Sequence, residues 1–259
     1  MISIKTPEDI ENLKISGKYL GQVLSYVAEH IKPGVSTDTL NDLAEQKIEE
    51  LGGEAAFLGY KPDWADTKYP ASLCVSVNDV VVHGIPNVEP IILQEGDTVG
   101  IDAGFIYNGM YTDSALTLIV GEGDKETRAL VQSTKEALYK AIKAARAGNT
   151  TGDIGYAVEG FVKERGYGLV KELAGHGVGY AVHEEPNIPN FGNPGEGVEL
   201  KAGMVIALEP MLNAGTGDVD FHEDGFTVTT ADGKKSAHFE HTIVITDGDP
   251  IVVTRRDNE

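Results

Sequence analysis

The sequence predicts a single α+β domain, residues 1–259, built from two halves at about 1–122 and 123–259. In each half, two helical stretches precede a group of strand-like segments, and this repeated order indicates an internal duplication. The connectors between the paired helices are alike, because Gly34 and Gly148 are each followed two and three residues later by hydroxyl side chains. No Ser/Gly/Pro-rich linker separates the halves. We therefore expect their strands to join and the helices to cover the outer face.

Composition limits the class of protein. The chain has 259 residues, 41% of them hydrophobic, which is enough for a sizeable core. Its single cysteine excludes an internal disulfide, and no apolar run is long enough for a signal peptide or a membrane span. We expect a cytoplasmic protein that is monomeric and has no membrane partner. The formal net charge of −20 repels phosphate backbones, so DNA is not an expected partner.

Two helices open the first half. Residues 6–9, Thr-Pro-Glu-Asp, supply a capping hydroxyl, a proline for the first turn and acids for the positive end of the helix dipole. Apolar residues at helical spacing extend this first helix to about His30. The second helix is predicted from Ser36 to Leu51, where Gly52-Gly53 ends it.

Strands complete the first half. The segments Ser72–Val77 and Asp79–His83 have strand-like composition. The segments Asp97–Tyr107 and Met110–Val120 flank Asn108-Gly109, a dipeptide that strongly favours a two-residue hairpin. We therefore predict one long hairpin at the end of this half.

The second half repeats the order. A third helix is predicted over residues 124–147, capped by Asp124, and a fourth helix runs from the Gly148 connector to about Arg165. Strands are then predicted around Leu173 and at Met204–Leu212, Gly225–Thr230 and Phe239–Thr246.

Two aspartates lie on opposite strands of the predicted hairpin. A two-residue turn makes Asp102 face Ala115, which places Asp113 on the same face of the sheet with its Cα about 7–8 Å from that of Asp102. Metal ions in two-metal sites lie roughly 3.5–4 Å apart, so this pair is suited to bind them. The alternative is a pair of exposed strand residues. The apolar setting argues against that alternative, because aspartate is disfavoured in strands and costly to bury unpaired.

The second half adds three candidate ligands. His176 lies between glycines in Gly175-His-Gly-Val-Gly, while Glu209 and Glu240 interrupt apolar strands. Taken singly, each residue has a structural alternative. The histidine could be a buried residue with its hydrogen bonds made, and each glutamate could point outward into solvent. Together with the two aspartates they form an oxygen-rich set with one imidazole, which favours Mn²⁺, Fe²⁺, Co²⁺ or Zn²⁺ over a thiolate-type structural zinc site.

Two more histidines are candidates for catalysis rather than metal binding. His83 lies in Val81-Val-His-Gly-Ile-Pro and His183 in Val182-His-Glu-Glu-Pro. A dinuclear hydrolase needs donors for the oxyanion and the substrate amide beyond its metal ligands. A surface histidine near a turn is the alternative for each. His30 is expected at a helix end, and no role is assigned to His222, His238 or His241.

Several short motifs occur along the chain in a characteristic order. They are Ser76-Val-Asn-Asp, His83-Gly-Ile-Pro, Asp102 with Asp113, Gly175-His-Gly-Val-Gly, His183-Glu-Glu-Pro, Glu209-Pro-Met and Glu240-His-Thr. In this order they resemble the type I methionine aminopeptidases over essentially the whole chain. The resemblance implies the pita-bread fold of that family, a pseudo-two-fold α+β domain with a curved, mostly antiparallel sheet and helices on its outer face.

The resemblance also implies a role for each candidate residue. Asp113 and Glu240 would bridge two divalent metal ions, Asp102 would bind one of them, and His176 and Glu209 the other. A bridging water or hydroxide would attack the scissile carbonyl with Glu209 as general base, His183 would stabilise the tetrahedral intermediate, and His83 would contact the substrate. The implied reaction removes the initiator methionine from nascent chains whose next residue is small. N-terminal methionine peptides are then the partners, with transient ribosome association left open.

The implied methionine pocket departs from familiar bacterial members. Its residues would be Phe57, Tyr60, Tyr69, Cys74, His83, Val182, His183 and Phe226. Phe57 stands where cysteine is common, and Val182 and Phe226 stand where larger aromatic residues are usual. The stretch Lys61–Lys68 lengthens a loop beside this pocket. These differences leave the shape of the pocket and the breadth of its substrates open.

Three other functions are alternatives. A prolidase or Xaa-Pro aminopeptidase shares the fold and metal set, but those relatives usually carry an additional N-terminal domain, and here the first helix is predicted near residue 7. A type II methionine aminopeptidase would need a helical insertion, for which the separations between His183, Glu209 and Glu240 leave no room. A non-catalytic pita-bread binding module would typically have lost ligands, whereas all five are present.

Overall fold

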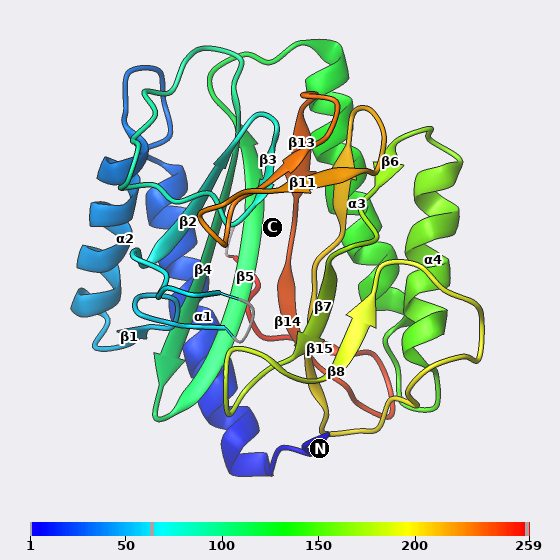
Figure 1. Ribbon diagram of the computed structural model, residues 1–259. Helices are drawn as coiled ribbons and strands as arrows, with labels where there is room; N and C mark the ends of the chain where they lie inside the picture. Colours follow the sequence, from blue (N-terminus) through cyan, green and yellow to red (C-terminus); the bar gives the residue numbers. More distant parts are fainter. Residues whose placement is uncertain (1, 63–64, 257–258) are drawn as a thin grey trace.

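The computed structural model describes residues 2–62, 65–256 and 259. Within this part of the chain, α1 (Pro7–Ala28) and α2 (Thr37–Glu50) lie on one side of the molecule, and α3 (Lys125–Ala144) and α4 (Thr151–Lys163) lie on the other, with the strands between the two pairs (Figure 1). This arrangement is the predicted α+β fold with helices outside. No helix among the described residues combines the length and apolar content that crossing a bilayer requires.

The strands are short except for one hairpin. In the first half they are β1 (Glu54–Ala55), β2 (Leu73–Val77), β3 (Val80–Val82), β4 (Thr98–Tyr107) and β5 (Met110–Ile119). In the second half they are β6 (Gly168–Leu169), β7 (Ala174–Gly177), β8 (Glu184–Pro189), β9 (Val205–Leu208), β10 (Met211–Asn213), β11 (Val219–Phe221), β12 (Val228–Thr230), β13 (Ser236–His238), β14 (His241–Val244) and β15 (Ile251–Val252).

The predicted hairpin has the predicted register. β4 and β5 are antiparallel with Asp102 opposite Ala115. Asn108 and Gly109 have φ values of 48° and 74°, the left-handed conformations that a tight turn of this kind requires. β2 pairs with the other edge of β4, so Cys74 lies opposite Asp102.

Polar side chains set the helix ends. The hydroxyl of Thr6 accepts a hydrogen bond from the Asp9 amide while the Asp9 carboxylate accepts one from the Thr6 amide, as in a capping box. The prediction for the third helix was three residues too long. The Asn149 side-chain amide donates to the Ala144 carbonyl at 2.8 Å, and this bond takes one of the last helical acceptors.

Two strands predicted in the second half are interrupted or shorter in the structure. The strand predicted over Met204–Leu212 breaks into β9 and β10 at Glu209-Pro210, where proline provides no amide for a ladder. The strand predicted over Phe239–Thr246 begins only at His241 and ends at Val244. Glu240 precedes it and pairs instead with β5, exchanging two main-chain hydrogen bonds with Ala115 at 2.9 and 3.4 Å. The two candidate glutamates therefore lie between strands rather than within them.

The two interhelix connectors make matching contacts. Gly34 and Gly148 have φ values of 88° and 89°. The Gly34 amide donates to the Leu93 carbonyl at 2.8 Å, and the Gly148 amide donates to the Leu200 carbonyl at 2.9 Å. Each connector is thus hydrogen-bonded to a later segment of its own half, as expected for duplicated halves.

The core lies in two main clusters, one for each helix pair. One cluster packs α1 and α2 against β2 and β4, with Leu20 and Phe105 fully buried. The other packs α3 and α4 against β9, β10 and β14, with Leu138 and Ile206 fully buried. The partly buried Leu116 on β5 packs against both clusters, so the two cores meet at this strand.

Substitutions at two glycines of α4 test how tightly this helix packs. A Cβ atom at Gly155 would lie 2.2 Å from the Phe191 carbonyl oxygen, whereas a Cβ at Gly160 would meet nothing within 4 Å. We expect Gly155→Ala to lower the free energy of unfolding by about 1–3 kcal/mol through overpacking. The matched change Gly160→Ala should raise it by about 0.5–1 kcal/mol, because alanine favours helix. Urea denaturation followed by circular dichroism measures both, and equal effects would contradict the packing described.

Candidate active site

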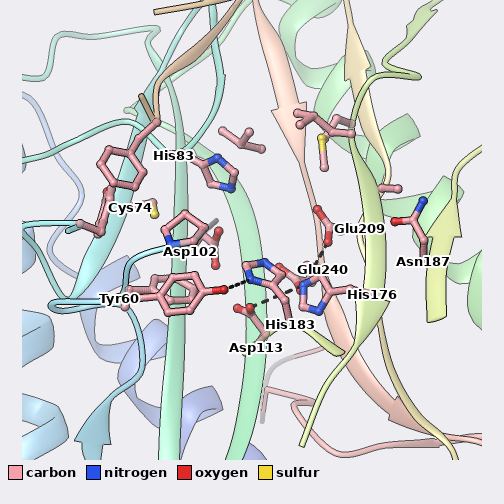
Figure 2. A pocket seen from close by; sticks show the side chains of 18 of the residues that line it. Tyr60, Cys74, His83, Asp102, Asp113, His176, His183, Asn187, Glu209 and Glu240 are labelled. Atoms are coloured by element: carbon pink, nitrogen blue, oxygen red, sulfur yellow. Dashed lines mark hydrogen bonds and ion pairs between the residues drawn. The ribbon is translucent and has the colours of Figure 1, made fainter. Parts of the chain in front are cut away.

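The five predicted ligands meet in one cavity of about 490 Å³ (Figure 2). Asp102 comes from β4, Asp113 from β5 and His176 from β7, while Glu209 lies just after β9 and Glu240 just before β14. One ligand atom from each of Asp113, His176 and Glu240 lies within 4.8 Å of the others. Glu209 joins this cluster through Oε1, which is 3.4 Å from His176 Nε2. Residues from both halves of the chain thus converge on one point.

The carboxylates of this cluster are buried, and several of their oxygens lack a hydrogen-bond partner among the described residues. Asp102 Oδ1, Asp113 Oδ1 and Glu240 Oε1 have no hydrogen-bond partner among the described residues. Burial, together with the neighbouring carboxylates, raises the pKa of Asp102, Glu209 and Glu240 well above the usual range, and burial raises that of Asp113 to about 7. Buried like charges of this kind repel one another unless a cation lies between them.

The donor set fits a divalent metal. Burial lowers the pKa of His176 to about 4, so its imidazole is neutral at pH 7 and can act as a ligand. Nδ1 of His176 lies 2.9 Å from the Gly177 carbonyl oxygen, a contact that leaves Nε2 facing the carboxylates. Carboxylate oxygens with one imidazole match the ligands that Mn²⁺, Fe²⁺, Co²⁺ and Zn²⁺ accept.

His83 and His183 face the same cavity. The His183 ring lies 4.3 Å from the His176 ring, centroid to centroid, and its Nδ1 forms a 2.7 Å hydrogen bond with the Tyr60 hydroxyl. His83 has a left-handed φ of 59° at the end of β3, which turns the chain at the cavity wall. Burial lowers the pKa of His83 to about 4 and that of His183 to about 3, so both rings are neutral at pH 7.

An apolar pocket adjoins the cluster. The expected residues Phe57, Tyr60, Tyr69, Cys74 and Phe226 line the cavity. The rings of Tyr69 and Phe226 pack edge to face at 5.2 Å, and the Tyr69 hydroxyl donates to the Gly84 carbonyl at 2.9 Å. One cavity therefore contains both the apolar side chains and the acidic cluster.

Val182 and the stretch Lys61–Lys68 differ in how they contact the pocket. Val182 packs among Phe57, Tyr69 and Phe226 in the surrounding apolar cluster and does not itself line the cavity. In the stretch Lys61–Lys68, Pro62 lines the cavity and Ala65 packs in the same cluster. Residues 63 and 64 of that stretch lie outside the described residues.

Sequence reasoning missed three features near the site, two cavity side chains and one supporting segment. Nε2 of His238 lies 4.0 Å from Glu209 Oε2 and 3.9 Å from Glu240 Oε2. Its position two residues before Glu240 is a pattern that could have placed both side chains on one face of an extended segment. Asn187 on β8 also lines the cavity (Figure 2).

The third missed feature is the N-terminal segment, which is bonded to the loop of residues 180–184 that contains His183. Glu184 Oε2 accepts hydrogen bonds from Ser3 Oγ at 2.6 Å and from Lys5 Nζ at 2.7 Å. Glu184 Oε1 accepts from the Ala181 amide at 3.2 Å, which closes the loop on itself. The Lys5 side chain is only 1% exposed, so this ion pair is shielded from solvent. His183 is thus positioned by residues far from it in the sequence.

Known proteins with a similar sequence and structure share this arrangement of the chain. The model of metallopeptidase family M24 matches residues 11–247. The chain is 46% identical to a methionine aminopeptidase of Aquifex aeolicus over 98% of each chain, and 41% identical to methionine aminopeptidase 1 of Bacillus subtilis over 98% of this chain and 100% of that one.

Solved structures give the same picture. The crystal structure of a methionine aminopeptidase from Thermotoga maritima superposes with a TM-score of 0.94 at 42% identity, covering 99% of this chain and 100% of that chain. A prolidase from Pyrococcus horikoshii superposes with a TM-score of 0.77 at 22% identity, covering 98% of this chain and 64% of that chain. The second likeness shows the pita-bread fold alone.

Removing Lys5 tests how strongly the N-terminal segment holds the loop. In Lys5→Met the Glu184 carboxylate loses its buried cation, so we expect the free energy of unfolding to fall by about 3 kcal/mol. Lys14→Met is the matched control, because its ion pair with Glu11 is exposed and contributes less than about 1 kcal/mol. Chemical denaturation of both variants decides the point. Equal losses of unfolding free energy in the two variants would show that the Lys5–Glu184 ion pair does not stabilise the loop.

Proposed function

The chain belongs to metallopeptidase family M24, and from that premise we propose that it is an aminopeptidase that removes N-terminal methionine with two divalent metal ions. The observation that carries the proposal is the cluster of buried carboxylates and one imidazole beside an apolar pocket. A metal cluster can activate water for hydrolysis, and an apolar pocket beside it can bind the side chain of the residue to be removed.

We propose that the five residues hold the ions in the way that the family resemblance implies. In that arrangement Asp113 and Glu240 would bridge the two ions, and their ligand atoms lie within 4.8 Å of each other and of His176. His176 and Glu209, in contact at 3.4 Å, would hold one ion, and Asp102 on β4 would hold the other. When bound, the ions lower the pKa of water and polarise the scissile carbonyl. Co²⁺, Mn²⁺, Fe²⁺ and Zn²⁺ all suit these donors.

Three side chains besides the metal ions would act on the substrate and on the attacking water. Glu209 accepts the proton of the attacking water as general base and passes it to the leaving amine. His183 stabilises the charge that develops on the carbonyl oxygen. A Tyr60 hydroxyl that donates to His183 Nδ1 leaves Nε2 as the protonated donor for this purpose. His83, which also lines the cavity, would contact the substrate.

The pocket supports methionine as the residue removed. A thioether packs favourably against aromatic rings, and Phe57, Tyr69 and Phe226 supply such rings beside the metal cluster. We propose that the next residue is small and that nascent chains are the physiological substrates, met in the cytoplasm with transient ribosome association. Because its ligands come from both halves, residues 1–259 would act as one catalytic domain, and we propose a monomer.

Substrate choice tests the function. Metal-free protein reloaded with Mn²⁺ or Co²⁺ should release methionine from Met-Ala-Ser, while Glu209→Gln should reduce kcat by about 10²–10⁴-fold because the general base is lost. Chromatography of the released amino acid measures this. Cleavage of Xaa-Pro substrates without methionine release would favour a prolidase. Inertness toward both, with binding of a partner retained in Glu209→Gln, would favour a non-catalytic module.

Metal stoichiometry tests the bridging assignment. Asp113→Ala should abolish activity and tight binding of two ions, because one carboxylate is shared between them. Asp249→Asn, whose side chain is 82% exposed, is the matched control and should bind two ions as the wild type does. Isothermal titration with Mn²⁺ gives the stoichiometry. Full activity with two tightly bound ions in Asp113→Ala would overturn the assignment.

A further inference from the structure

His238 is a buried histidine whose main chain is held on both sides. It ends β13 and pairs with Met211 on β10. Its amide donates to the Thr117 hydroxyl at 2.9 Å, and that hydroxyl donates to the His238 carbonyl at 2.8 Å. The residue is only 5% exposed. The side chain therefore projects from a fixed point of the backbone into the interior.

The end of this side chain has no partner of its own. Nε2 of His238 is buried and makes no hydrogen bond among the described residues. It faces two carboxylates, with Glu209 Oε2 at 4.0 Å and Glu240 Oε2 at 3.9 Å. These separations are about 1 Å longer than a hydrogen bond. Since buried polar atoms without partners are rare and costly, the position calls for an acceptor.

The two carboxylates are not equivalent as acceptors. Glu240 belongs to the central cluster with Asp113 and His176, and as a bridge it needs both oxygens for metal ions. Glu209 faces His176 with Oε1 at 3.4 Å and His238 with Oε2. One oxygen of Glu209 thus points to the metal side of the cluster and the other remains free to accept from an outer donor.

We propose that His238 is a positioning residue for Glu209, donating its Nε2–H to Glu209 Oε2 and so directing Oε1 toward the metal ion. This inference rests on the metal site proposed above. Donors behind a ligating carboxylate fix its orientation, and their loss lowers metal affinity or activity by about 10- to 100-fold. The same bond would aim the general base at the water that it deprotonates.

Two amide substitutions separate this role from simple packing. The amide nitrogen of glutamine extends as far from the backbone as Nε2 of histidine, whereas that of asparagine is one bond shorter. Both variants keep a polar donor, but only His238→Gln can reach Glu209. Mn²⁺ affinity of the metal-free protein is measured by isothermal titration, and kcat and KM are measured with Met-Ala-Ser.

We expect His238→Asn to weaken Mn²⁺ binding and to lower kcat, each by about 10- to 100-fold. KM should change little, because the apolar pocket is untouched. His238→Gln should restore both affinity and kcat toward the wild type. Phe239→Leu is the control, since this neighbouring side chain is buried in the core and should alter thermal stability but not Mn²⁺ affinity.

Wild-type Mn²⁺ affinity in His238→Asn would overturn the proposal, as would an equal loss in His238→Gln and His238→Asn. If His238→Asn does not fold, His238→Met replaces it, because methionine has similar reach and no donor. The titration does not depend on peptide cleavage. A wild-type protein that binds Mn²⁺ but releases no methionine would therefore refute the proposed function, and the Mn²⁺ affinities of the two variants would still decide the role of His238.

Discussion

The two halves of the chain are joined along β5, whose main chain and hydroxyl groups bond to residues 238–242. Ala115 and Glu240 exchange main-chain hydrogen bonds at 2.9 and 3.4 Å, and the Thr242 hydroxyl both accepts from the Asp113 amide and donates to the Asp113 carbonyl. This pairing places the side chains of Asp113 and Glu240 together although they are far apart in the sequence. The rest of the site is arranged around that contact, with Asp102 on the neighbouring strand β4 and His176 on the second-half sheet.

The same contact concentrates negative charge in the interior. Asp102, Asp113 and Glu240 are each at most 9% exposed, and each has an oxygen without a partner among the described residues. These groups do not add to the free energy of unfolding, since apolar residues of similar size would pack there without a desolvation penalty. A divalent cation bound among them would offset that penalty. The neighbouring histidines stay neutral through burial and so remain available as ligands and donors.

Local patterns predicted much of this correctly, and the errors have identifiable causes. Asn108-Gly109 defined both the turn and the register of the hairpin, because its left-handed conformations allow few alternatives. The strands around Glu209 and Glu240 were predicted as continuous because periodicity does not show where a chain changes partners. Glu240 leaves the second-half ladder to bond with Ala115, which no local pattern reveals. The role of Lys5 was equally hidden, since its partner Glu184 is distant in the sequence.

The sequence by itself determined the helix starts, the hairpin register and the residue types of the metal site, because capping, turn chemistry and misplaced acids are local properties. The resemblance carried by its motifs extended this to the pita-bread fold and the family. Only the tertiary structure decided which atoms meet. It placed Oε1 of Glu209 beside His176 and Oε2 beside His238, and it left Val182 behind the cavity wall. These outcomes depend on the pairing of β5 with residues 238–242, a contact between the two halves that local rules do not specify.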